Sequence, residues 1–278
     1  NLGSDDNTTQ FVAGAIQQGK KLGFKVELVM VTDDIALPDN PQPRGIAGTA
    51  LIHKVAGYAA ASGKSLEEVM AAANEAIAAT ASLGLAFSSC HVPGEKRDER
   101  VKEGQSELGM GIHGEPGAST LKTQDSREIV ALMAAKLAEH NPDNKKTALL
   151  INNLGGFSSL EMAVLTREVL RSPLGKQVDL LIGPATLVSA LDMKGFSLST
   201  LLLTDALAEA LQAPVEASGW QPASKPAPLN TRQGEKVARQ QHFAPSENAS
   251  TAAIVATVCR TLAELETELN QLDAKVGY

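Results

Sequence analysis

The sequence predicts an α/β fold, with layered mixed sheets flanked by helices, followed by a linker and one long amphipathic helix. Through about residue 220, β-branched or apolar runs of strand length alternate with amphipathic runs of helix length, the pattern of helices packed on sheets. The extended runs at 107–112 and 196–203 lack full-length helices beside them, so we expect mixed rather than purely parallel pairing. After Trp220, prolines punctuate a polar stretch before one last helical repeat.

Residues 10–112 are predicted to form three helices and three strands. Ser65 and Glu68 have the spacing of a capping box, in which each side chain satisfies a backbone N–H group at the start of a helix. Gly23 follows the first helical run, where a C-terminal cap is expected. The predicted elements are helices at 10–21, 45–61 and 66–80, strands at 26–31, 83–90 and 108–112, and a charged surface loop at 95–105.

Residues 125–211 are predicted to add three more helices and three more strands. Asp125 suits the start of a helix, and Ser158 and Glu161 repeat the capping-box spacing. The predicted elements are helices at 125–137, 158–170 and 204–211, and strands at 147–151, 178–182 and 196–203.

The C-terminal helix carries a single apolar stripe. Its apolar side chains recur every three or four residues, which places them on one face of a helix about seven turns long. A lone helix does not bury such a stripe, so we expect it to begin a second domain or to dock on the main body or on a partner. The stripe consists of Ile254, Val258, Leu262, Leu265, Leu269 and Leu272.

Charge and cysteine content indicate which partners the protein binds and in which cellular compartment it works. Among 278 residues, 32 acidic and 25 basic side chains give a net charge of −7, the wrong sign for a protein that binds nucleic acid. Cys90 and Cys259 have neither the number nor the spacing of a disulfide framework or a metal site. The sequence therefore predicts a cytoplasmic protein in a reducing environment.

Neither an export signal nor a membrane span is expected. The first residues lack a basic region followed by an apolar stretch, and no run approaches 18 apolar residues. The first residue is not Met, so we expect a processed chain or a piece of a longer protein.

His113 is the most prominent candidate for chemistry. It leaves a predicted strand and enters a turn with three glycines around it, at 111, 114 and 117, so a small ligand can approach the imidazole without backbone crowding. A ring that only hydrogen-bonds its own turn is the alternative. The sequence contains no His-Glu-x-x-His or paired-cysteine pattern, so a catalytic zinc is not indicated.

Two glycine-bearing segments were considered as phosphate sites. Residues 44–49 open a helix but lack the P-loop and dinucleotide-binding patterns, so close helix packing is the preferred interpretation. Residues 152–156 follow a strand, where α/β proteins commonly bind ligands, but this signal is weak by itself. Cys90 next to His91 is a further weak candidate, for thiol chemistry.

Several segments together resemble one family, the single-chain ATP-dependent dihydroxyacetone kinases. The match runs in order from about residue 20 to 277, and the motif around His113 is highly specific. The segments are RGIAGT and IHKVAG at 44–57, SLG through SSCHVP at 82–93, ELGMGIHGEPG at 107–117, INNLGG at 151–156, LDMKGFS at 191–197 and LNQLDAKVG at 269–277.

The resemblance implies three regions. Residues 1–220 correspond to the substrate-binding domain, 221–247 to a linker, and 248–278 to the first helix of an incomplete nucleotide-binding domain. The remainder of that domain is expected to be missing from this chain. By the same resemblance the intact enzyme uses ATP and Mg²⁺, whereas this chain alone is not expected to bind them productively.

The resemblance also implies roles for three residues. His113 corresponds to the histidine that forms a covalent hemiaminal with the substrate carbonyl carbon. Asp5, in a turn similar to the family's, corresponds to the acid/base group that also binds substrate. Asp273 corresponds to the first of three aspartates that hold magnesium and ATP.

The implied reaction of the intact enzyme converts dihydroxyacetone and ATP into dihydroxyacetone phosphate and ADP, in a homodimer. Covalent capture by a neutral imidazole discriminates a ketone from a polyol, because a polyol has no electrophilic carbon. Two alternatives remain. One is a non-catalytic, ketone-binding sensor or coregulator, and the other is a kinase for a different short hydroxyketone such as a tetrulose.

Overall fold

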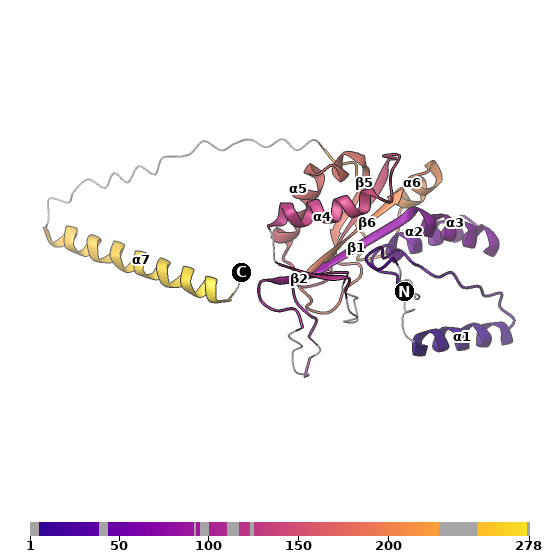
Figure 1. Cartoon of the computed structure of the whole chain (residues 1–278), viewed down its shortest axis with the longest axis horizontal. Coiled ribbons are helices and arrows are strands. Elements are labelled where there is room, and N and C mark those ends of the chain that lie inside the picture. The colour runs from indigo at the N-terminus through magenta and orange to yellow at the C-terminus, as the bar shows by residue number, and fades with distance from the viewer. Residues whose placement is uncertain are drawn as a thin grey trace. The chain divides into compact units, whose positions relative to one another are not determined.

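The computed structural model describes residues 6–38, 44–91, 93–94, 100–109, 117–122, 125–227 and 249–276. The chain divides into two compact units, Asn1–Pro228 and Leu229–Tyr278. The described part of the first unit contains one sheet and six α-helices, and that of the second is a single helix (Figure 1). The first unit therefore combines helices with a sheet, as the sequence predicts.

The sheet of the first unit has six strands in the order β3-β2-β1-β6-β4-β5. Only β4 and β5 pair in parallel, and every other neighbouring pair is antiparallel, which confirms the predicted mixed pairing. The strands are β1 (Thr80–Ala86), β2 (Gln105–Leu108), β3 (Ser119–Lys122), β4 (Thr147–Asn153), β5 (Val178–Ala185) and β6 (Gly195–Leu202).

Helices cover both faces of the sheet (Figure 1). One face carries α4 and α5, and the other carries α2, α3 and α6. The helices are α1 (Asp6–Lys21), α2 (Thr49–Ala61), α3 (Leu66–Ala79), α4 (Ser126–Ala138), α5 (Ser159–Arg171), α6 (Asp205–Gln212) and α7 (Ala249–Val276), with a short 3-10 turn at Leu174–Gln177.

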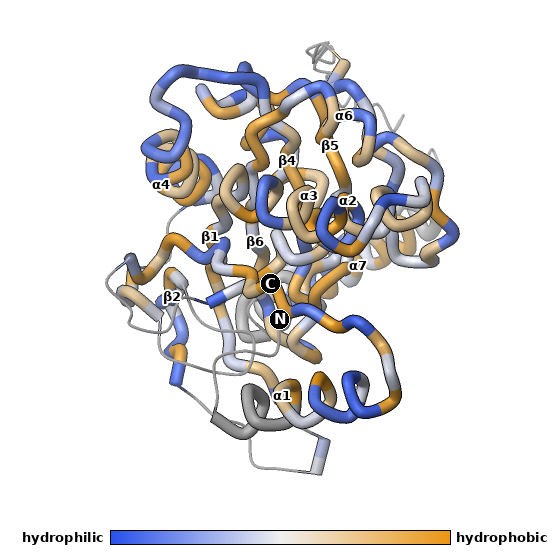
Figure 2. Tube along the Cα trace, turned by 90° about the vertical axis from the view of Figure 1, so that its right-hand side faces the viewer, coloured by the Kyte–Doolittle hydropathy of each residue, from blue (hydrophilic) through white to orange (hydrophobic). Residues whose placement is uncertain are grey.

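Strand β4 shows why the central strands lack polar alternation. Leu149 and Ile151 pack into the core beside α4 and α5, whereas Ala148 and Leu150 pack into the core beside α2, α3 and α6. Figure 2 shows the hydrophobic colouring of β4 and of its neighbour β5. A strand covered on both faces reads as one continuous apolar run.

Local signals at the helix starts are confirmed. Ser65 and Ser158 both form complete capping boxes, and the Asp125 carboxylate accepts two backbone N–H groups at the start of α4. Gly23 has the left-handed conformation (φ +85°) expected of a cap after α1.

One predicted strand was wrong, and one strand was missed. Residues 26–31 are extended but pair with no strand among the described residues, because the local pattern does not specify a neighbour. Strand β3 was not predicted, since three of its four side chains are exposed and its position depends on pairing with β2. The predicted run at 108–112 ends as a strand at Leu108, and residues 110–112 lie outside the described residues.

The segment after Trp220 begins on the body of the first unit. Ser224 exchanges two backbone hydrogen bonds with Leu181 of β5, so the start of the predicted linker lies along the sheet. The final helix is confirmed as α7, and its described side chains are exposed, including Ile254, Val258 and Leu262. Among the described residues, no helix is both long and apolar enough to span a bilayer.

Candidate functional site

The candidate site lies where two segments meet along one edge of β1. Asp34 forms a parallel bridge with Ser82, and Ile35 N–H donates to the Ser82 carbonyl at 3.0 Å. Two residues farther along β1, Gly109 N–H donates to the Gly84 carbonyl at 2.7 Å. The end of β2 therefore lies next to residues 33–36, and the predicted turn that carries His113 follows Gly109 directly in the sequence.

Arg44 holds the first end of that turn. Its Nε and Nη2 atoms donate to Asp34 Oδ2 at 2.9 and 2.6 Å, and Nη2 also donates to the Gly109 carbonyl at 2.7 Å. The two side chains expose only 7% and 2% of their surfaces, so water screens this ion pair little. Gly109 has φ +73°, and a Cβ there would lie 2.3 Å from Ala36 Cβ, so the position requires glycine.

Glu107 holds the other end. Its Oε1 accepts hydrogen bonds from Gly117 N–H and from Arg100 Nη2. A Cβ on Gly117 would lie 2.6 Å from the Leu108 carbonyl oxygen, so the backbone approach is close here as well. Ala118 N–H donates to the same carbonyl at 2.8 Å. Charge-assisted hydrogen bonds thus hold the chain immediately before and after residues 110–116.

Asp33 organises the start of α2 beside the junction. This fully buried carboxylate accepts Ile46 N–H at 2.8 Å and Gly48 N–H at 2.9 Å. Burial raises the pKa of Asp33, and hydrogen bonds from Ser82, Ile46 and Gly48 oppose that rise. A Cβ on Gly48 would lie 2.4 Å from Asp33 Oδ2. Close packing therefore explains this glycine, and Asp33 uses the N–H groups that a phosphate would need.

The loop after β4 is also committed to packing. Asn152 Oδ1 accepts Leu187 and Val188 N–H groups at 2.9 and 3.0 Å, and its Nδ2 donates to the Val188 carbonyl. A Cβ on Gly155 would lie 2.1 Å from the Leu191 carbonyl oxygen. Asn152 and both glycines therefore shape contacts with 187–194, and Asn153 Oδ1 accepts the N–H groups of Gly155 and Phe157. These contacts leave no cradle for an anion.

The remaining sequence candidates are not brought together by the described structure. His91 donates its backbone N–H to Asp192 Oδ1 at 2.6 Å, and Cys90 packs beside a small apolar cluster. His113 and Asp5 lie outside the described residues, and Asp273 lies in α7 at a position where side chains are not described. Within the described part of the chain, no three acidic, His or Cys side chains are grouped to hold a metal ion.

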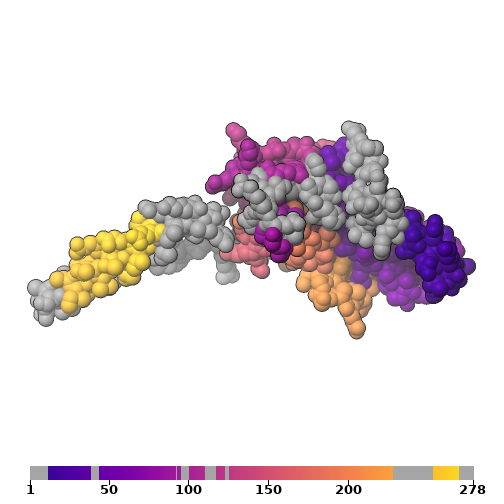
Figure 3. Space-filling model, turned by 90° about the horizontal axis from the view of Figure 1, so that it is seen from below, coloured from indigo at the N-terminus to yellow at the C-terminus, as the bar shows by residue number. Residues whose placement is uncertain are grey.

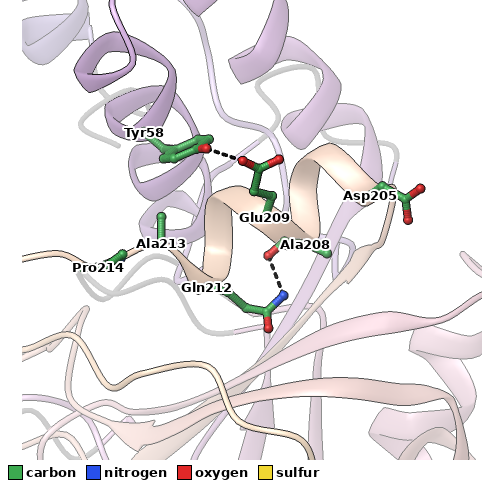
Figure 4. Close-up of a pocket in the computed structure, with 7 residues that line it drawn as sticks. All are labelled: Tyr58, Asp205, Ala208, Glu209, Gln212, Ala213 and Pro214. Atoms are coloured by element: carbon green, nitrogen blue, oxygen red, sulfur yellow. Dashed lines mark hydrogen bonds between the residues drawn. The ribbon is translucent and has the colours of Figure 1, made fainter.

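Sequence analysis missed a hollow of about 570 Å³ beside α2 and α6. Figure 4 shows Tyr58 turned toward Glu209, to which its hydroxyl donates at 2.6 Å. This carboxylate raises the pKa of Tyr58. Lining residues come from α2, α6 and the chain that follows α6. Because they lie far apart in the sequence, no local motif signalled the hollow.

Comparison with known proteins gives one consistent result. The sequence profile described as the Dak1 domain matches residues 11–219. The dihydroxyacetone kinase of Citrobacter freundii is 50% identical over 264 residues, which cover 95% of this chain and 48% of that protein. The human triokinase/FMN cyclase is 36% identical over 283 residues, which cover 95% of this chain and 49% of that protein.

Solved structures agree with the sequence matches. The native C. freundii dihydroxyacetone kinase superposes with a TM-score of 0.80 at 47% identity, covering 99% of this chain and 51% of that chain. The structure of the same kinase in complex with AMP-PNP and Mg²⁺ gives a TM-score of 0.79 at 47% identity, covering 99% of this chain and 52% of that one. The chain therefore spans about half the length of these relatives.

Proposed function

This chain belongs to the Dak1 domain family, and we propose that it is the substrate-binding part of an ATP-dependent dihydroxyacetone kinase. Its substrate is dihydroxyacetone, which the intact enzyme phosphorylates to dihydroxyacetone phosphate. Similarity along 95% of the chain to a kinase of that name supports the proposal. We assign residues 1–220 to ketone binding, 221–247 to a linker and 248–278 to the first helix of a nucleotide-binding domain.

His113 captures the ketone. The unprotonated nitrogen of the neutral imidazole adds to the carbonyl carbon, and the C=O double bond becomes a C–O single bond. The other ring nitrogen loses its proton and the former carbonyl oxygen takes one up, which gives a neutral hemiaminal. Glycerol has no carbonyl carbon and does not form this bond. Capture fixes the substrate and its terminal hydroxyl, and such positioning supplies much of the catalysis in phosphoryl transfer.

The observation that carries this role is the anchoring of the turn at both ends. The Gly109 carbonyl accepts from Arg44, and Gly117 N–H donates to Glu107. A covalent site gains from such anchoring, because the nucleophile must return to the same position in every turnover. Asp5 is proposed as the acid/base group near the substrate hydroxyl.

ATP and Mg²⁺ act in the intact enzyme. Support comes from the relative's complex with AMP-PNP and Mg²⁺. The described residues alone do not fit such a site, because they contain no group of three metal-ligating side chains. Asp273 is proposed as one metal ligand of a site that further polypeptide completes. We also propose that the enzyme is a cytoplasmic homodimer.

Mass spectrometry tests the capture step. Incubation of the chain with dihydroxyacetone is expected to add one substrate mass reversibly, and glycerol is expected to add nothing. His113→Ala should abolish the adduct, whereas the matched control His140→Ala should keep it, since His140 lies at the end of α4 and contacts the Lys136 carbonyl. An undiminished adduct in His113→Ala would exclude the role assigned to His113.

A further inference from the structure

The charged stretch at 95–105, predicted to be a surface loop, is only partly exposed where the structure describes it. Residues 102–104 are exposed, but Val101 packs against the small apolar cluster that includes Met193. The purple part of the chain, to which these residues belong, reaches the molecular surface in Figure 3. The packing of Val101 fixes the backbone beside Arg100, so the Arg100 side chain starts from a defined position.

The Arg100 guanidinium binds Glu107 of β2. Its Nη2 atom donates to Glu107 Oε1, and the two side chains expose 29% and 10% of their surfaces. The same Oε1 atom accepts Gly117 N–H. Hydrogen bonds to an ionised carboxylate are roughly twice as strong as those between neutral groups. One carboxylate oxygen therefore connects the guanidinium to the backbone directly after residues 110–116.

The two ends of this segment are supported unequally. Before it, Gly109 is bonded to Gly84 of the interior strand β1 and to the buried Arg44. After it, Gly117 leads into β3, which pairs with β2 alone among the described residues and exposes three of its four side chains. The second end therefore depends more on the side chain of Glu107 and on what holds that side chain in place.

We propose that Arg100 is a positioning residue for the capture of dihydroxyacetone, and that it acts through Glu107 on the segment that carries His113. This inference rests on the proposed function. The guanidinium holds the Glu107 carboxylate at Gly117 N–H, so the end of the segment keeps one position. A segment held at both ends loses less conformational freedom when its histidine forms a covalent bond. Removal of Arg100 should therefore weaken capture and leave the chemistry of the bond unchanged.

An ordinary surface ion pair is the alternative interpretation of this contact. Such pairs contribute little to stability, and this chain contains a matched example in Arg127 and Glu168. Their Nε and Oε2 atoms lie 3.7 Å apart, and the Glu168 side chain is 9% exposed, close to the 10% of Glu107. The Arg100 pair differs because its carboxylate oxygen also binds a backbone N–H group next to the candidate site. Arg127 is therefore a suitable control.

Titration with dihydroxyacetone tests the positioning role. The adduct is measured by mass spectrometry against ketone concentration, at a temperature where circular dichroism shows every variant to be folded. Arg100→Met is expected to raise the concentration for half-maximal adduct by about 10-fold. Arg100→Lys keeps a charged donor and should recover most of this loss, whereas Arg127→Met should not change the titration.

Two results would overturn the positioning role. One is an Arg100→Met titration equal to that of the original chain, and the other is an equal loss in Arg100→Met and Arg127→Met. Should Arg100→Met not fold, Arg100→Gln is titrated in its place, with the same expectation and the same two contradicting results.

A double-mutant cycle tests whether Arg100 acts through Glu107. Glu107→Gln keeps an oxygen that can accept Gly117 N–H but removes the charge that pairs with Arg100. Arg100→Met should weaken capture by about 10-fold in the original chain and by less than about 2-fold in Glu107→Gln, because the effects of directly coupled residues are not additive. The same loss in both backgrounds would contradict an action through Glu107.

The positioning role and the proposed function fail in different ways. An original chain that forms no adduct contradicts the proposed function, and with it any positioning role. An adduct that is lost in His113→Ala but unchanged in Arg100→Met contradicts the positioning role alone.

Discussion

Strand β1 and residues 24–32 have similar strand-like sequences but opposite environments. All seven residues of β1 are buried, and the strand pairs with β2 on one side and β6 on the other. Residues 25–32 have no such neighbours among the described residues, and large apolar side chains of the segment remain exposed. An apolar run of this kind thus predicts an extended backbone, whereas pairing and burial depend on neighbouring segments that the run does not specify.

The boundary between the two environments falls within a few residues. Asp33 and Asp34 are held by backbone bonds to β1, by the start of α2 and by Arg44, but residue 32 is already exposed. Gly109, which precedes the segment with His113 in the sequence, lies on the anchored side of this boundary. The described residues thus include supports before and after residues 110–116, whereas they include no neighbouring strand for residues 25–32.

Removal of the anchor at this boundary should have the largest effect. Arg44→Met leaves the Asp34 carboxylate buried without its partner, so we expect a loss of about 4 kcal/mol in the free energy of unfolding. Lys64→Met is the control, because its pair with Glu68 is 54% exposed on both sides and contributes less than about 0.5 kcal/mol. Urea denaturation followed by circular dichroism measures both. Similar losses in the two variants would contradict a buried anchor.

The two strands themselves are compared by truncating one leucine in each. Leu83→Ala in β1 removes a fully buried side chain and should cost about 3 kcal/mol. Leu28→Ala should change the stability of the chain alone by less than about 0.5 kcal/mol, since Leu28 is half exposed. Urea denaturation of both variants measures the difference. A large loss in Leu28→Ala would mean that residues 24–32 are already covered in this chain.

Local signals account for most of the fold that was predicted. The capping boxes of α3 and α5 involve residues three apart, so the sequence shows them directly. The pairing of β3 with β2 depends on register between two strands, and the exposed side chains of β3 carry no apolar pattern. The failed strand prediction at 26–31 has the same origin, because the run does not specify its neighbours.

His113 was the one residue of the candidate site that the sequence singled out, and its role stays a prediction. Glycines on both sides of His113, together with the family resemblance, singled out that turn. Its supports were not predicted, because Arg44 and Gly109 are 65 residues apart and no spacing rule links them. Asp33 was likewise not singled out, since its role at the start of α2 exists only after folding.

Two glycines, Gly48 immediately before α2 and Gly57 within it, should respond oppositely to the same change. Gly48→Ala places a Cβ 2.4 Å from Asp33 Oδ2 and 2.7 Å from Thr80 Cγ2, so we expect a loss of about 2 kcal/mol from overpacking at the anchored boundary. Gly57 has no atom within 4 Å of such a Cβ, and Gly57→Ala should stabilise the helix by about 0.5 kcal/mol. Thermal unfolding of both variants shows whether each substitution raises or lowers the stability. A stable Gly48→Ala protein would show that the boundary is loosely packed.

The smallest expected effect concerns Glu161 at the start of α5. Partial burial raises the pKa of Glu161, but hydrogen bonds from Ser158 and the ion pair with Lys194 outweigh this and hold the pKa below its usual 4.5. A lowered pKa contributes stability above the unfolded value, and this is lost as the pH falls through the folded value. Glu161→Gln should therefore be less stable than the original chain by up to about 0.5 kcal/mol at neutral pH, where a partly exposed pair is screened by water.

The difference in the free energy of unfolding between Glu161→Gln and the original chain should shrink as the pH falls below about 4.5. It should also shrink in high salt, because the pair with Lys194 is partly exposed. Urea denaturation at several pH values measures it. A difference that grows on acidification would mean that Glu161 is protonated more readily in the folded chain than in the unfolded one. The surroundings of Glu161 at the start of α5 would then disfavour its charged form, despite the hydrogen bonds with Ser158.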